Sequence, residues 1–167
     1  PVASTYIKNA IKKGSKLILI DPRGQKQGLA KYAEHIIQFK PGQDLALLNA
    51  MIHTIIKEKL YDTNFVKNRT IGFDNLVEET KDYSPKNMEK ICGIKASVII
   101  DIARLYAKSD KSIIFWGMGI SQHVHGTENA RCLISLALIS GHIGKDGTGL
   151  HPLRGQNNVQ GASDAGL

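Results

Sequence analysis

Two short apolar runs, "KLILID" (16–21) and "SIIFWGMG" (112–119), constrain the fold most strongly. Each run is too short for a helix, and turn-forming residues end both of them, Pro22 in the first case and Gly117 in the second. Short continuous apolar runs are typical of strands that are buried on both faces of a parallel sheet. A third candidate strand is "IIQF" (36–39). Because helical patterns separate these runs, the sequence predicts an α/β fold.

The helical patterns on either side of the strands differ in character. Residues 2–14 place apolar side chains on one helical face and end in two lysines and a glycine, which is typical of a helix C-terminus. Asp44 is placed to cap a helix whose apolar face extends from Leu45 to Ile56. The segment "TENARCLISLALISG" (127–141) is apolar on nearly all sides, which indicates a core helix.

The middle of the chain carries further helix signals. Ser84 is a candidate N-cap, Pro85 suits the first helical position, and Gly93 suits the end of that helix. Apolar residues also recur at helical spacing in "KASVIIDIARLYAKS" (95–109). We therefore expect a helical insert of two or three short helices. The predicted fold is an α/β, Rossmann-like domain with a short parallel sheet flanked by helices, this insert, and an irregular glycine-rich C-terminal loop.

Composition limits the classes of function. A chain of 167 residues with 42% apolar content has the size of one domain and can bury a core without metal or disulfides. The net charge of +7 comes from scattered basic residues, which are either solvated or attract an anionic partner such as a phosphate. We expect no nucleic-acid partner. Cys92 and Cys132 form no metal-binding motif, so we interpret both as inert packing residues.

The ends of the chain and its apolar content bear on its context. There is no apolar run of transmembrane length and no signal-peptide pattern, so we expect no membrane contact from this segment and favour a cytoplasmic location over the periplasm. Pro1 has no preceding methionine, which suggests a fragment of a longer protein.

Polar residues follow the first and second apolar runs, where ligands of open parallel sheets bind. Asp21 can accept hydrogen bonds from ribose hydroxyls, or its carboxylate can close a turn by bonding the backbone two residues on. Arg23 can pair with a phosphate or be solvated. Gly117 and Gly119 permit close approach of a ligand, and Gln122 offers a donor and an acceptor, although a tight strand exit explains the glycines equally well.

Three further segments are candidates for binding. Gly42 and Asp44 precede a helix whose N–H groups can face an anion, although helix capping alone explains Asp44. His123 and His125 would share one face of a strand, but no third metal ligand accompanies them. Residues 149–167 fit no helix or strand pattern, and the glycine-flanked polar run "RGQNNVQG" (154–161) indicates a ligand-binding loop.

Taken in order, several segments resemble one family, the catalytic subunits of molybdenum- or tungsten-dependent formate dehydrogenases within the molybdopterin oxidoreductases. These segments are "KGSKLILIDPR", "FKPGQDLALLNAMIHTIIKEKLYD", "FVKNRTIGF", "IIFWGMGISQHVHGTEN" and "PLRGQNNVQGASD". The resemblance covers nearly the whole chain, and its last two segments are the most specific. Ser163 stands where formate dehydrogenases of this type have a cysteine.

The resemblance implies a pair of pyranopterin guanine dinucleotides that hold a Mo or W ion. It places Asp21 and Arg23 at the guanosine end of one dinucleotide and Gly42 and Asp44 near it. It places four residues on the pyrophosphate and pterin side: Gly117, Met118, Gly119 and Gln122. Arg154 matches the active-site arginine that helps to hold formate for oxidation to carbon dioxide, with Gln156 beside it.

The resemblance also implies what lies outside this segment. The metal-binding cysteine or selenocysteine, a 4Fe-4S cluster and the second half of the cofactor cradle would belong to the remaining domains of the same subunit, and an electron-transfer subunit is the expected partner. The isolated fragment should be inactive. We expect a molybdopterin guanine dinucleotide-binding domain at 1–148 and a truncated active-site loop at 149–167. The alternatives are another molybdopterin oxidoreductase such as nitrate reductase, or a non-catalytic α/β nucleotide-binding module.

Overall fold

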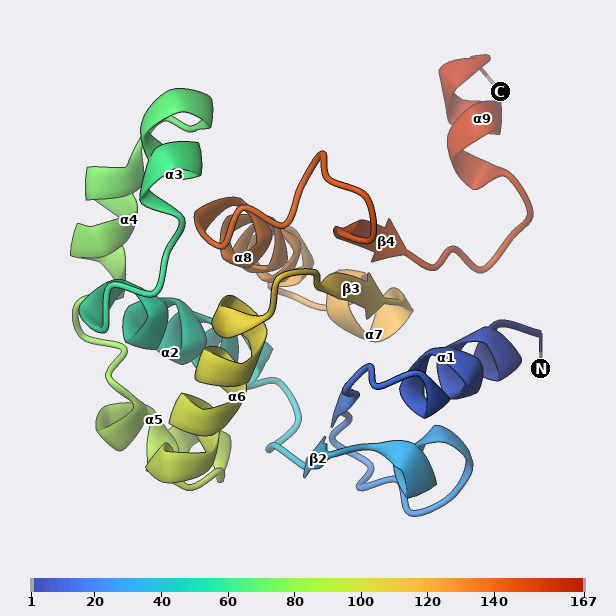
Figure 1. The fold of residues 1–167 in the computed structure, drawn as a ribbon, viewed down its shortest axis with the longest axis horizontal. Coiled ribbons are helices and arrows are strands. Elements are labelled where there is room, and N and C mark those ends of the chain that lie inside the picture. The colour runs from blue at the N-terminus through green and yellow to red at the C-terminus, as the bar shows by residue number, and fades with distance from the viewer. Residues whose placement is uncertain (1, 167) are drawn as a thin grey trace.

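The computed structural model describes residues 2–166, in which helices surround a single apolar core and two pairs of short strands lie at one side (Figure 1). The elements follow one another as α1 (Val2–Lys12), β1 (Ile18–Ile20), the 3-10 helix η1 (Gly28–Tyr32), β2 (His35–Ile37), α2 (Asp44–Lys57), α3 (Thr63–Arg69), α4 (Phe73–Thr80), α5 (Pro85–Cys92), α6 (Ala96–Lys108), β3 (Ile113–Trp116), α7 (Met118–Ser121), α8 (Gly126–Ile139), β4 (Gly149–Pro152) and α9 (Val159–Asp164).

The strands are parallel, as the sequence predicts, so the α/β class is confirmed. They form two separate pairs rather than one sheet: β1 pairs with β2 and β3 pairs with β4. The prediction that the apolar runs are buried on both faces is wrong. Ile20 is 38% exposed and Phe115 is 50% exposed. An apolar run reports the residue types in a strand but not how many of its faces other elements cover.

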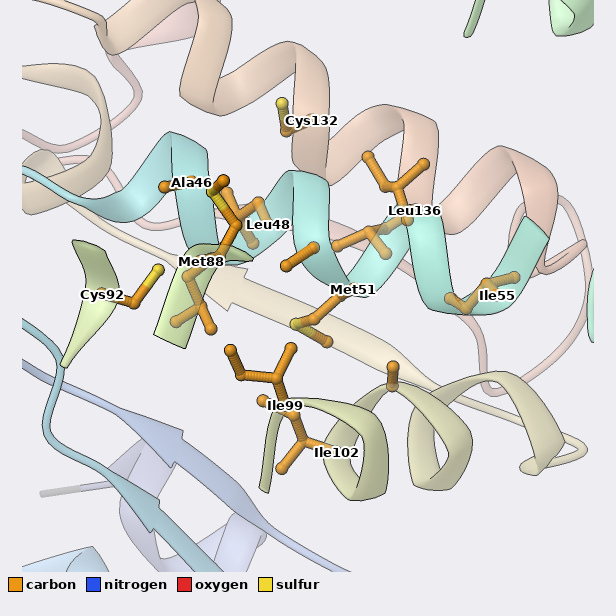
Figure 2. Close-up of a cluster of buried hydrophobic side chains, with 14 of the residues drawn as sticks. Ala46, Leu48, Met51, Ile55, Met88, Cys92, Ile99, Ile102, Cys132 and Leu136 are labelled. Atoms are coloured by element: carbon orange, nitrogen blue, oxygen red, sulfur yellow. The ribbon is translucent and has the colours of Figure 1, made fainter. Parts of the chain in front are cut away.

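The core lies among α2, α5, α6 and α8 rather than around the strands (Figure 2). Ile52 and Ile55 of α2 have no exposed surface, and neither have Ile99 and Ile102 of α6. Leu136 of α8 packs on the opposite side of α2 from α6 in Figure 2. The apolar faces predicted for α2 and α6 are therefore the faces that these two helices bury.

The insert between α2 and β3, all of which is described, contains four helices where the sequence predicts two or three. The predicted ends of α5 are confirmed, because Ser84 Oγ accepts from the Asn87 N–H and Gly93 has the left-handed conformation. Helices α3 and α4 were missed. Their start signals are Asp62, which accepts from the Phe65 N–H at 2.9 Å, and Gly72, which has a φ of 75°.

The two cysteines are packing residues, as predicted. Cys92 and Cys132 are both buried and free. Burial raises the pKa of each thiol to about 11, so neither is a reactive thiolate at neutral pH. None of the helices among residues 2–166 is long and apolar enough to cross a membrane.

The C-terminal segment has more regular structure than its sequence indicates. Residues 149–152 form β4, and residues 159–164 form the short helix α9. The prediction that residues 149–167 fit no helix or strand pattern is therefore wrong for these two stretches. In Figure 1, α9 stands apart from the other helices at the end of an extended stretch. The segment is held to the rest of the chain by strand pairing with β3, which no local pattern could reveal.

Candidate functional site

An open cleft of about 150 Å³ lies at the carboxyl ends of β3 and β4. Because the two strands are parallel, Trp116 and Pro152 are partners at the same edge, and the Leu153 N–H donates to the Trp116 carbonyl at 2.7 Å. The chain leaves both strands at this edge, so two segments that are far apart in the sequence face each other. This is the position at which open parallel sheets bind their ligands.

The cleft brings together five residues that the sequence singled out: Gly117, Met118, Gln122, Arg154 and Gln156. It also contains six described residues that were not named as site residues: Trp116, Ser121, Pro152, Leu153, Gly155 and Val159. Most of the missed residues flank a predicted one, so adjacency was an available signal. No sequence signal indicated the pairing of β3 with β4, which brings Pro152 and Leu153 to the cleft.

The glycines before and within α7 are not required by the fold. A Cβ atom on Gly119 would meet no heavy atom within 4 Å, and one on Gly117 would lie 3.9 Å from the Leu153 carbonyl, an ordinary contact. Neither glycine has a positive φ. The chain itself would therefore accept alanine at both positions, which leaves room at the backbone for a ligand. Residues 118–121 form the short helix α7, with Gly117 as its N-cap.

Arg154 is the one charged residue among the described residues that line the cleft. It is exposed, and none of the ion pairs among residues 2–166 includes it. An unpaired guanidinium with parallel N–H donors suits a carboxylate or a phosphate. The cleft can thus bind an anion in a fixed orientation.

Gly42 and Asp44 lie near the cleft segment through His123. A Cβ atom on Gly42 would stand 3.6 Å from His123 Nε2, and His123 follows the cleft residue Gln122. The prediction that Asp44 caps α2 is wrong: Gln43 is the N-cap, without a side-chain cap bond, and Asp44 is the first helical residue. Asp44 is 8% exposed, and burial raises the pKa of its carboxyl, an effect that hydrogen bonding from its own backbone N–H partly offsets.

Asp21 and Arg23 bind each other at the end of β1 and do not line the cleft. Asp21 Oδ1 accepts from the Arg23 backbone N–H at 2.8 Å, so the turn-closing interpretation of Asp21 is confirmed. The Arg23 guanidinium donates to both carboxylate oxygens, at 3.1 and 2.8 Å. Hydrogen bonding from the Arg23 side chain is the main reason that the pKa of Asp21 is lowered. Arg23 is thus paired within the chain, neither simply solvated nor free.

His123 and His125 lie in the turn between α7 and α8, so the expectation that they share a strand face is wrong. The His125 N–H donates to His123 Nδ1 at 3.1 Å, which leaves Nε2 to carry the proton of the neutral ring. Among residues 2–166 no group of three or more His, Cys, Asp or Glu side chains could hold a metal ion. The two histidines therefore complete no metal site with other described residues.

Comparison with known proteins gives consistent results. The chain is 47% identical over 166 residues to the alpha subunit of an F420-dependent formate dehydrogenase of Methanocaldococcus jannaschii, covering 99% of this chain and 24% of the relative. It is 45% identical to formate dehydrogenase H of Escherichia coli, covering 99% and 23%. The solved structure of acetylene hydratase from Pelobacter acetylenicus is similar with a TM-score of 0.78 and 32% identity, covering 84% of this chain and 19% of the hydratase.

These similarities cover 84–99% of this chain but only part of each relative. The chain spans about a quarter of the length of the curated relatives it matches. The sequence model for molybdopterin oxidoreductases matches residues 1–167. This chain therefore belongs to the molybdopterin oxidoreductase family.

Proposed function

We propose that the chain is the part of a formate dehydrogenase catalytic subunit that binds one pyranopterin guanine dinucleotide of a bis-pterin Mo or W centre. The observation that carries this proposal is the cleft at the ends of β3 and β4. Gly117, which lines the cleft, and Gly119, which lies beside it in α7, have no steric role within the chain, and the single charged residue of the cleft, Arg154, has no ion-pair partner among residues 2–166. The formate dehydrogenase subunits at 42–47% identity support the choice of subfamily.

The residues of the cleft fit such a cofactor. The backbone at Gly117 and Gly119 would lie against the pyrophosphate and pterin, and the side chains of Met118 and Gln122 would line the same side. A cleft of about 150 Å³ is smaller than the usual pocket for a ligand of this size, roughly 300–1,000 Å³. This chain would therefore contact only part of the cofactor, and the remaining domains of the subunit would cover the rest.

The guanosine end of the cofactor would extend toward the other two groups of residues. Gly42 and Asp44 lie next to His123, beyond the Gln122 end of the cleft. Asp21 and Arg23 form a turn at the end of the neighbouring strand pair. In this proposal the carboxylate of Asp21 would accept from ribose hydroxyls while it remains bonded to Arg23, since a carboxylate has about four lone-pair sites.

Arg154 would hold formate, with Gln156 beside it. A guanidinium can donate two parallel hydrogen bonds to the two oxygens of a carboxylate, which determines both position and orientation. When bound, the metal centre supplies the two-electron acceptor for the oxidation of formate to carbon dioxide. Electrons would then pass to a 4Fe-4S cluster elsewhere in the subunit and to an electron-transfer subunit. The chain by itself would be inactive, with a cofactor-binding domain at 1–148 and an active-site loop at 149–167 that begins with β4.

The test is the substitution Arg154→Lys in the complete subunit, with formate kinetics and metal content measured on the same preparation. A lysine keeps the charge but not the paired donors, so kcat/KM should fall on the order of 100-fold while Mo or W content is unchanged. Near-normal kcat/KM at full metal content would reject the proposed role of Arg154. If the wild-type complete subunit has no activity on formate, formate is rejected as its substrate. This control is needed because acetylene hydratase has a similar fold, and a fold does not determine the reaction.

A further inference from the structure

The helix α7 is central to the cleft but too short to hold itself in place. It has four residues, two of which, Met118 and Ser121, line the cleft, and the cleft residues Gly117 and Gln122 flank it. Helices far longer than four residues are marginal in water without tertiary contacts. The position of α7 must therefore be set by the elements against which it packs.

The first residue of α8, Gly126, lies directly against the end of α7. Gly126 is buried, and a Cβ atom built on it would lie 2.0 Å from the Ser121 carbonyl oxygen. Its φ is not positive, so the backbone conformation does not call for glycine here. Glycine is required at this position because the backbones of α7 and α8 approach too closely for any side chain.

One turn further along α8, the side chain of Asn129 forms a hydrogen bond that links α8 to α7. Its side chain is fully buried, and Nδ2 donates to the Ile120 carbonyl at 3.2 Å. The last carbonyls of a helix have no partner within it, so this bond satisfies a group that α7 cannot satisfy alone. Asn129 Oδ1 has no hydrogen-bond partner among residues 2–166, so the bond to Ile120 is the one side-chain hydrogen bond that offsets the burial of this amide.

We propose that Gly126 and Asn129 are positioning residues that set the distance and orientation of α7 and thereby shape the cofactor cleft. Neither residue lines the cleft itself. The inference rests on the proposed function, because it concerns the alignment of Met118, Ser121 and Gln122 with a bound pyranopterin guanine dinucleotide.

Two variants change this alignment in different ways. In Gly126→Ala the contact to Ser121 must open by about 1.4 Å, from 2.0 Å to the 3.4 Å at which ordinary contacts begin. Asn129→Leu keeps a side chain of similar size but removes the bond to Ile120. The matched control is Leu136→Ala on the same helix, because Leu136 is 2% exposed and packs in the core against α2 (Figure 2).

Two measurements read out the effect. The first is the NMR shift of the Met118 methyl group and of the Ser121 and Gln122 amides in the chain, which follows the position of α7 without any ligand. The second is the amount of GMP released by hydrolysis of the purified complete subunit, which counts bound guanine dinucleotide. Gly126→Ala and Asn129→Leu should shift the α7 signals and lower the GMP content by about tenfold or more, since misplacement by about 1 Å is costly in a site of fixed geometry. Leu136→Ala should lower the melting temperature but leave both readouts unchanged.

Unchanged α7 signals in both variants would overturn the inference, and so would displaced α7 with full GMP content. An equal loss of GMP in Leu136→Ala would overturn it as well, because general destabilisation would then explain the effect. The variant Gly119→Ala separates these outcomes from a failure of the proposed function. Its added methyl meets nothing in the chain, so full GMP content in that variant would count against the proposed contact between the cofactor and the α7 backbone.

Discussion

Gly119→Ala perturbs the α7 backbone beside the cleft, and the substitution creates no steric clash within the chain. Gly119 lies within α7, and an added Cβ would meet no heavy atom within 4 Å. Glycine costs up to about 1 kcal/mol relative to alanine in a helix interior, and Gly119 is close to the start of a short helix. We therefore expect the free energy of unfolding to rise by about 0.5 kcal/mol, which corresponds to an increase of about 1–2 °C in the melting temperature.

The same methyl group should interfere with a cofactor that contacts the backbone of α7. Overpacking a filled site by one methyl group costs about 1–3 kcal/mol, so cofactor content in the complete subunit should fall by about tenfold. The two assays are a thermal melt of the chain and GMP released per purified subunit. Ser97→Ala, at an exposed position of α6, is the control and should change neither quantity appreciably.

Two results would contradict this reasoning. A lower melting temperature in Gly119→Ala would mean that the space beside Gly119 is not free. An unchanged cofactor content would mean that Gly119 does not serve close approach of a ligand, and the proposed contact between the cofactor and the α7 backbone would lose its support.

Two other predictions follow from buried or paired groups. Burial lowers the pKa of His142 from its ordinary value of 6.5, so the unfolded chain takes up a proton first as the pH falls. The free energy of unfolding should therefore decrease below about pH 6.5, by at most about 1.4 kcal/mol per pH unit. Thermal melts at pH 7.5 and 5.5 should show a smaller decrease in the His142→Gln variant than in the wild-type chain. An equal decrease in both proteins would exclude His142 as its source. Asp21→Asn should leave the melting temperature nearly unchanged, because Arg23 is largely exposed and solvent screens the pair, but should lower Mo or W content in the complete subunit. Full metal content would show that Asp21 only closes its turn.

Local signals were sufficient for much of the fold. Ser84 and Gly93 mark the ends of α5 because capping depends on the few residues at a helix end. The buried faces of α2 and α6 follow from helical periodicity, since a helix must cover its apolar side. The α7 segment and the "RGQNNVQG" segment were also identified from residue chemistry, because runs of glycines and polar side chains cannot supply a packed apolar core.

Tertiary structure decided what these segments do together. Trp116 and Pro152 meet only because β3 pairs with β4, and pairing between segments that are far apart in the chain leaves no periodic trace in either one. The role of Gly126 could likewise not be predicted from the local sequence, because only the tertiary structure places the Ser121 carbonyl against it. Asp44 could be assigned as a cap from the sequence, yet the helix begins one residue earlier and leaves its carboxyl buried beside His123. The sequence by itself determined the long helices α2, α6 and α8, the strands β1 and β3 and the segments that carry binding chemistry, because those properties depend on near neighbours, whereas α3, α4, β4 and α9 were not predicted. Only the tertiary structure decided which of these segments face one another across the cleft, because that depends on contacts whose partners lie tens of residues apart.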